Sequence, residues 1–313
     1  MAEKNVDLEL ILHIIPPPMR LNWSTPRSLF ISTFLNHARG DKAPIGHVFI
    51  EFPLPKNASL NVSPKIAPLL VGAHRVITGM TRQKMTVIES LKVVQGKRLG
   101  LGSFYYDFKG KLDSIKEAHE EIAWAKARGR LATIHVSISE EKAQLMMEFL
   151  KEWIEHGSFR HYSGGLRVDC GEGSGCAEFG MHYLSMALGV HATNPEWVRR
   201  VRVPHDLIGG GFAGHAERVS MFQIFKNGDR WAYGSEPHHV YSVPDPELIF
   251  DWIKNHASVS NKTGAPSVTM IPGAVNWSSG EFVRREFEVK YPLESMGSVQ
   301  EQWAKVTDSK NVK

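Results

Sequence analysis

Cysteine is scarce in this chain, since Cys170 and Cys176 are the only two among 313 residues. Two cysteines cannot build the disulfide framework that holds many small secreted domains together. An excess of charge is also lacking, because 37 basic and 33 acidic residues give a formal net charge of +4. No basic helix with interleaved aromatic residues is visible, so we expect no nucleic-acid partner.

Long apolar runs are missing as well. No stretch approaches the length needed to cross a bilayer, and we expect no transmembrane segment. The first seven residues are polar and charged and lack the basic and apolar regions of a signal peptide. We therefore expect a cytoplasmic location. With 42% hydrophobic and 22% charged residues, the composition is that of an ordinary globular protein.

The most distinctive stretch is a glycine-broken loop that opens directly into an apolar helix. Gly171, Gly173 and Gly175 alternate, so we expect a helix only from Cys176 onward. Two apolar stripes follow at helical spacing, which indicates a helix that is buried on two sides. They are Cys176, Phe179, Tyr183 and Met186, and Ala177, Met181, Leu184 and Leu188. At a helix N-terminus, the dipole and the free N–H groups favour a thiolate and can also receive an oxyanion.

Strand and helix patterns alternate before this stretch. Alternating or apolar segments predict strands over 6–15, 45–52, 69–80, 103–108 and 131–138. Capping residues and helical periodicity predict helices over 25–36, 114–126 and 140–155. In the second strand, His47 and Glu51 share one face. His74 falls on the third strand.

Signals are weaker after residue 191. We predict a β-hairpin with strands over 218–225 and 230–233, a helix over 246–255, and strands over 268–271 and 282–289. No linker is visible, so we expect one α+β domain over 1–313. Its core would span 6–192, and 193–313 would be a C-terminal α/β elaboration.

The segment Ile45-Gly46-His47-Val48-Phe49-Ile50-Glu51-Phe52 resembles the glycine–histidine strand of the circularly permuted papain-like cysteine hydrolases. This group includes a permuted NlpC-type branch and the lecithin:retinol acyltransferase-like proteins. In the permuted branch the histidine strand comes first and the cysteine helix follows well over a hundred residues later, which is the order of His47 and Cys176. The helix over 140–155, Tyr162 and the cysteine helix also resemble the family's layout.

The resemblance covers roughly residues 6–191, and the region from Thr193 onward has no counterpart in it. It implies a permuted papain-like fold, in which an antiparallel sheet packs against the buried helix that carries the cysteine. It further implies peptidase or amidase chemistry, with acyl transfer from a lipid as another activity of the same group.

The residue types point to the same chemistry. A cysteine nucleophile needs a base within hydrogen-bond reach, and the base needs an orienting group. We predict that Cys176 is the nucleophile and His47 the base. His74 is the predicted orienter, as the resemblance puts a polar residue on the strand after the histidine, and Glu51 is the alternative. By resemblance, Tyr162 is a candidate to support the oxyanion.

These residues predict a hydrolase that cleaves an amide or ester bond through a thioester acyl-enzyme. The expected substrate is a peptide, an amide or a lipid ester. The mechanism needs no cofactor and no metal ion.

Other interpretations stay open at this point. In the non-permuted NlpC-type order, Cys170 would be the nucleophile and His215 the base. His161, Cys170, Cys176 and His182 have the right atoms for a zinc site, although their spacing matches no compact motif. Cys176 could also be an ordinary core residue in a binding or scaffold protein without catalytic activity.

Overall fold

A six-stranded antiparallel sheet forms the centre of the protein, with strand order β11-β7-β1-β2-β4-β3. The structure, a computed structural model, describes residues 8–40, 42–55, 64–72, 74–189, 194–212, 218–263 and 271–273. The sheet strands are β1 (Glu9–Ile15), β2 (His47–Pro53), β3 (Leu70–Val71), β4 (Arg75–Thr78), β7 (Leu131–Ser137) and β11 (Ile271–Gly273). The described part of the chain is therefore an α+β protein built on an antiparallel sheet, as predicted.

Two smaller antiparallel sheets and seven helices complete the described part of the chain. One sheet has the order β5-β6-β8, with β5 (Met80–Arg82), β6 (Phe108–Leu112) and β8 (His161–Tyr162), and the other pairs β9 (Val198–Pro204) with β10 (His238–Pro244). The helices are α1 (Pro26–Ala38), α2 (Val87–Gly96), α3 (Ile115–Ala127), α4 (Glu140–Glu155), α5 (Cys176–Leu188), α6 (Met221–Asn227) and α7 (Pro246–Thr263).

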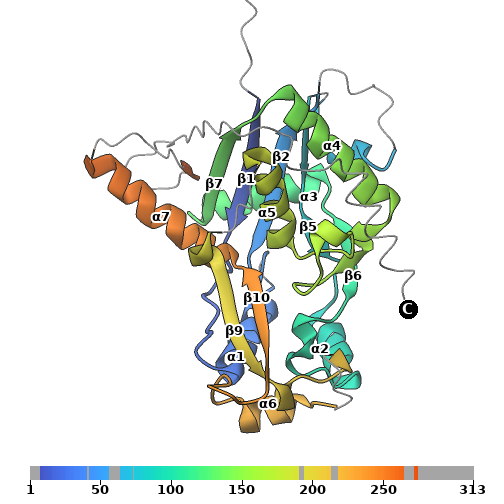
Figure 1. Cartoon of the computed structure of the whole chain (residues 1–313), viewed down its shortest axis with the longest axis vertical. Helices are drawn as coiled ribbons and strands as arrows, with labels where there is room; N and C mark the ends of the chain where they lie inside the picture. The colour runs from blue at the N-terminus through green and yellow to red at the C-terminus, as the bar shows by residue number, and fades with distance from the viewer. Residues whose placement is uncertain are drawn as a thin grey trace, which may run out of the picture.

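Helices cover both faces of the large sheet because its strands are apolar on both sides. Val48, Ile50 and Phe52 belong to the core that includes residues of α4 and α5, whereas Phe49 packs with residues of α3. In Figure 1, α4 and α5 lie on the near side of the sheet and α3 lies behind it. The two faces of β2 therefore pack against different helices, with α4 and α5 on one side and α3 on the other.

The cysteine-bearing helix runs through the main core. Phe179 and Tyr183 of α5 and Trp153 of α4 are fully buried, and their rings lie within 5.1–5.6 Å of an aromatic neighbour in this group. Truncating one such side chain to alanine typically costs about 3–5 kcal/mol. The first turn of α5 is consequently held against the sheet by the packing of its later turns.

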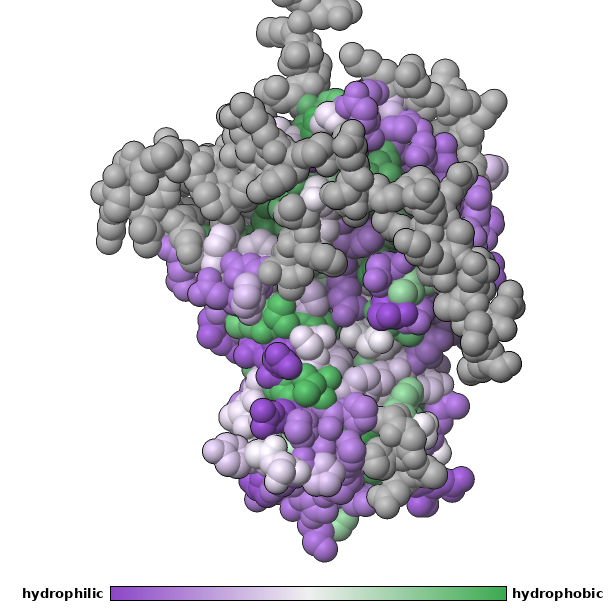
Figure 2. Space-filling view, in the orientation of Figure 1, coloured by the Kyte–Doolittle hydropathy of each residue, from purple (hydrophilic) through white to green (hydrophobic). Residues whose placement is uncertain are grey.

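A second group of elements lies at the end of the large sheet where β2 begins. In the view of Figure 1, α1, α2, α6, β9 and β10 lie below the large sheet. Polar residues cover most of the lower half of this face, and separate apolar patches lie near its middle (Figure 2). None of the described helices is long and apolar enough to span a bilayer.

Several predicted elements differ in the structure. The predicted strand over 69–80 is broken into β3, β4 and β5. In the predicted strand over 103–108, Ser103 and Phe104 end a 3-10 helix and only Phe108 lies in β6. The predicted hairpin over 218–233 is wrong, because Ser220 and Gln223 form a capping box that starts α6. Helix α2 was not predicted, although Thr86 and Glu89 form a capping box at its start. The predicted strand over 282–289 lies outside the described residues.

Candidate functional site

Cys176 is the first residue of α5, as predicted. Gly175 is the helix N-cap, with the extended backbone angles φ −80° and ψ 165°, and Gly173 adopts φ +125°. The cysteine is 6% exposed, and its Sγ lies 4.0 Å from the carbonyl oxygen of Gly46. The N–H groups of the first helical turn have no partner within the helix, so they are available to an anion beside the thiol.

His47 is the first residue of β2 and lies at the same end of the sheet. Its Nε2 is 3.1 Å from Oδ2 of Asp113, and both side chains are buried. Its ring lies beside the thiol of Cys176, because each of the two groups shifts the pKa of the other. Because Asp113 occupies Nε2, Nδ1 is the ring nitrogen left to face the sulfur. The carboxylate thereby selects the tautomer that presents Nδ1 to the thiol.

The pKa values of His47 and Cys176 are both shifted in this group. Burial lowers the pKa of His47, but the negative charge of Cys176 and the hydrogen bond that His47 donates to Asp113 outweigh it, so the pKa is raised well above its usual value. Burial raises the pKa of Cys176, but the charge of His47 and its hydrogen bond outweigh it and lower the pKa. These opposite shifts favour a thiolate–imidazolium pair, which is the nucleophilic form of a cysteine.

Tyr162 lies on β8 and completes the surroundings of the thiol. Its hydroxyl lies beside Cys176, because each of the two groups shifts the pKa of the other. Burial, followed by the charge of Cys176, raises the pKa of Tyr162 well above its usual value. The hydroxyl therefore stays protonated and can donate a hydrogen bond to the thiolate or to an oxyanion.

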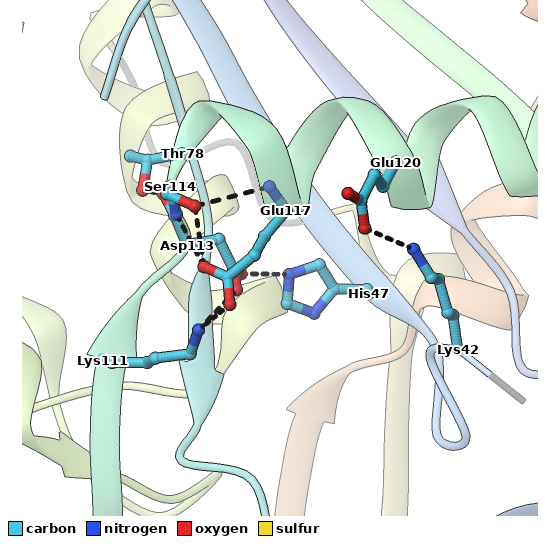
Figure 3. A network of polar contacts seen from close by, with 8 residues as sticks. All are labelled: Lys42, His47, Thr78, Lys111, Asp113, Ser114, Glu117 and Glu120. Atoms are coloured by element: carbon cyan, nitrogen blue, oxygen red, sulfur yellow. Dashed lines mark hydrogen bonds and ion pairs between the residues drawn. The ribbon is translucent and has the colours of Figure 1, made fainter. Parts of the chain in front are cut away.

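A polar network holds Asp113 in place (Figure 3). The N–H of Asp113 donates to Gly79 over 2.9 Å, and the Thr78 hydroxyl donates to the Asp113 carbonyl over 2.8 Å. Lys111 lies 3.8 Å from Oδ1 of Asp113 and also pairs with Glu117. These contacts fix the carboxylate against the edge of the sheet, where Nε2 of His47 reaches it.

Two glycines leave room for the histidine. Gly46 has φ +84°, and an added Cβ would lie 2.9 Å from Cβ of Pro246 and 3.1 Å from the carbonyl oxygen of Ile15. A Cβ at Gly79 would lie 2.8 Å from Nε2 of His47. Any larger residue at either position would push His47 away from Asp113 or strain the start of β2.

The structure does not bring His74 to His47. The antiparallel pairing of β2 with β4 sets Pro53 opposite Arg75, so His74 lies beside Leu54, at the far end of β2. The His74 side chain is exposed there. The expectation that it orients His47 therefore fails on strand register, and the partner of His47 is Asp113.

Glu51 shares a strand face with His47, as expected, but Phe49 stands between them. Its carboxylate pairs with His13 at 3.0 Å and with Arg75 at 2.5 Å. Burial raises the pKa of Glu51, and these two partners outweigh it and lower the pKa to about 2. Glu51 thus belongs to an ion-pair network of the sheet and not to the surroundings of the thiol.

The other sequence interpretations find less support. Cys170 ends a short 3-10 turn, and burial together with Asp169 raises the pKa of its thiol. Its proposed partner His215 lies outside the described residues. Among the residues that the structure describes, no group of three or more histidine, cysteine, aspartate or glutamate side chains is arranged to hold a metal ion. The predicted alternative of His161, Cys170, Cys176 and His182 is therefore not assembled.

Asp113 was missed in the sequence. It follows β6 and directly precedes Ser114, whose capping box with Glu117 starts α3. An acidic residue between a strand and a capping box was a visible signal. The sequence did not show that this junction lies against the end of β2, because the contact spans 66 residues of chain.

The comparisons with known proteins give no family for this chain. No family model matches it, no curated protein matches its sequence, and no solved structure matches it. The arrangement of Cys176, His47, Asp113 and Tyr162 therefore carries the functional argument by itself.

Proposed function

We propose that this protein is a cysteine hydrolase with a permuted papain-like fold, which cleaves an amide or ester bond through a thioester acyl-enzyme. The observation that supports this most is the buried group of Cys176, His47 and Asp113, in which the pKa of the thiol is lowered and that of the imidazole is raised. A cysteine with only a packing role has no need of a hydrogen-bonded histidine and a carboxylate behind it.

The first half-reaction of the proposed cycle forms the thioester. The thiolate of Cys176 attacks the carbonyl carbon of the substrate, and the carbonyl oxygen becomes an oxyanion. The N–H of Cys176 and the hydroxyl of Tyr162 donate hydrogen bonds to that oxygen. The imidazolium of His47 then gives its Nδ1 proton to the leaving amine or alcohol, and the C–S bond of the thioester remains.

Hydrolysis completes the cycle. Neutral His47 takes a proton from water, the hydroxide adds to the thioester carbonyl, and the acid leaves as the thiolate of Cys176 is restored. The Asp113 carboxylate stabilises the imidazolium whenever it forms. The order of histidine strand before cysteine helix, and the antiparallel sheet against the buried helix α5, also support the permuted papain-like assignment.

Acylation by an activated ester tests this proposal. Incubation with p-nitrophenyl acetate and mass spectrometry of the intact protein should reveal one acetyl group on Cys176, with release of p-nitrophenol. The adduct should be absent in Cys176→Ala, form much more slowly in His47→Ala, and remain in the matched thiol control Cys170→Ser.

A different result would point to another function. If Cys176 acquires no acyl group and its alkylation by iodoacetamide is no faster than that of a free thiol, the protein is a binding or scaffold protein. Labelling of Cys170 instead of Cys176 would support the non-permuted order.

A further inference from the structure

Arg82 is a half-buried guanidinium beside the thiol site that has no carboxylate partner. It is the last residue of β5, and its Cζ lies 5.2 Å from the ring centroid of Phe108. Burial lowers its pKa, and the nearby Tyr162 acts in the opposite direction. Among the described residues, no acidic side chain forms an ion pair with it.

Two other partly buried arginines of this chain are paired with a carboxylate. Arg75 binds Glu51 at 2.5 Å, and Arg199 binds Asp245 at 3.0 Å. Leaving a guanidinium partly desolvated without an anion costs free energy, so charges of this kind are normally paired or bind a ligand. The planar fork of an arginine matches the two oxygens of a carboxylate.

Strand register places Arg82 next to the tyrosine of the site. Arg82 pairs with Gly110, and Tyr162 pairs with Phe108, so the side chains of Arg82, Phe108 and Tyr162 share one face of the β5-β6-β8 sheet. A Cβ at Gly110 would lie 3.2 Å from Cβ of Tyr162 and 2.6 Å from the carbonyl oxygen of Phe159. The glycine therefore lets Tyr162 pack closely over β6, on the same face as the guanidinium.

The tyrosine connects this charge to the thiol. Tyr162 interacts electrostatically with both Cys176 and Arg82. A substrate group that binds next to Tyr162 thus lies within electrostatic reach of Arg82. An anionic group at that position would meet a guanidinium that no protein carboxylate neutralises.

We propose that Arg82 forms a carboxylate-binding subsite of this enzyme, so that the preferred substrate carries a carboxylate close to the bond that is cleaved. This inference rests on the proposed role of Cys176 as the nucleophile. It narrows the substrate class from any amide or ester to acidic peptides or amides, since a neutral lipid ester would leave the guanidinium unpaired.

Two alkylating reagents of different charge test the subsite without knowledge of the substrate. Iodoacetate and iodoacetamide react by the same mechanism, in which the thiolate displaces iodide and a thioether forms. They differ in that iodoacetate brings a carboxylate. Rates would be measured for Cys176 in a Cys170→Ser background, and the iodoacetate-to-iodoacetamide rate ratio would be compared with that of a free cysteine peptide.

We expect the iodoacetate-to-iodoacetamide rate ratio of Cys176 to be at least about tenfold above that of the peptide. A charge-assisted hydrogen bond from Arg82 to the carboxylate of iodoacetate would favour that reagent by about this factor. Arg82→Gln should lower the ratio by a similar factor, and Arg82→Lys should keep part of it. Arg128→Gln is the matched control, since Arg128 also lies over an aromatic ring, that of Trp124, but is exposed at the end of α3. Its ratio should equal that of the wild type.

The outcomes separate this inference from the proposed function. Fast iodoacetamide alkylation with an iodoacetate ratio no higher than that of the peptide, or one that Arg82→Gln leaves unchanged, overturns the subsite and leaves the nucleophile in place. Slow alkylation of Cys176 by both reagents overturns the nucleophile itself and the subsite with it. If Arg82→Gln does not fold, the wild-type ratio and the Arg82→Lys variant decide the question.

Discussion

Replacing Asp113 by asparagine isolates the charge behind His47. The amide oxygen of asparagine can still accept the Nε2 hydrogen bond, so the ring keeps its tautomer and loses only the negative partner at 3.1 Å. A hydrogen bond to a charged group typically contributes about 1.5–3 kcal/mol. Both side chains are less than 10% exposed, so solvent screening reduces this little.

That energy corresponds to a roughly ten- to hundredfold lower ratio of the thiolate–imidazolium pair to the neutral pair. Loss of Asp113 destabilises the imidazolium, so the pKa of His47 falls and the pKa of Cys176 rises. Thiolate formation then moves to higher pH. We expect alkylation of Asp113→Asn by iodoacetamide to be at least about tenfold slower near pH 6 and to recover above pH 9.

Alkylation rates between pH 5 and 10 check this expectation. Asp113→Ala also removes the acceptor, so it should be slow to acylate even where the thiol is ionised. Asp107→Asn is the matched control, because Asp107 pairs with the exposed His161 at 2.6 Å and should leave the pH profile unchanged. If the alkylation rate of Asp113→Asn at acidic pH equals that of the wild type, the electrostatic role of this carboxylate is refuted.

Three further predictions follow from single positions. Glu51→Gln should lower the free energy of unfolding at pH 7 by about 3 kcal/mol, because a pKa of about 2 in the folded state is well below the usual 4.5. That stabilisation is present above pH 4.5 and is lost as the pH falls towards 2, so urea unfolding at pH 7 and pH 2 should differ less in the variant than in the wild type. Its alkylation rate should not change. Gly46→Ala should lower the free energy of unfolding in urea by on the order of 3 kcal/mol. An alanine at this position would have to adopt left-handed backbone angles, and its Cβ would lie 2.9 Å from Cβ of Pro246. Wild-type stability of this variant would contradict the packing argument. His74→Ala should leave the alkylation rate of Cys176 unchanged, because His74 is exposed at the far end of β2; a large loss of rate would restore it as the orienter.

Local sequence determined the elements that carry Cys176 and His47. The alternating glycines and two apolar stripes set the start of α5 at Cys176, because glycine disfavours the helix and the stripes require burial on two sides. The alternation in 45–52 predicted β2 with His47 and Glu51 on one face. Capping boxes placed α3, because a serine and a glutamate three residues later satisfy each other's backbone N–H groups.

Only the tertiary structure decided which side chains meet. His74 and Glu51 were reasonable partners for His47 by strand order and strand face, but antiparallel register and the intervening Phe49 separate them from it. Asp113 reaches His47 through a hydrogen bond between segments far apart in the chain, and Arg82 shares a face with Tyr162 through the pairing of β5 with β6. Both contacts depend on how the sheets assemble. Local pattern specifies an element and its buried face, whereas register and the meeting of strand ends depend on packing across the whole chain.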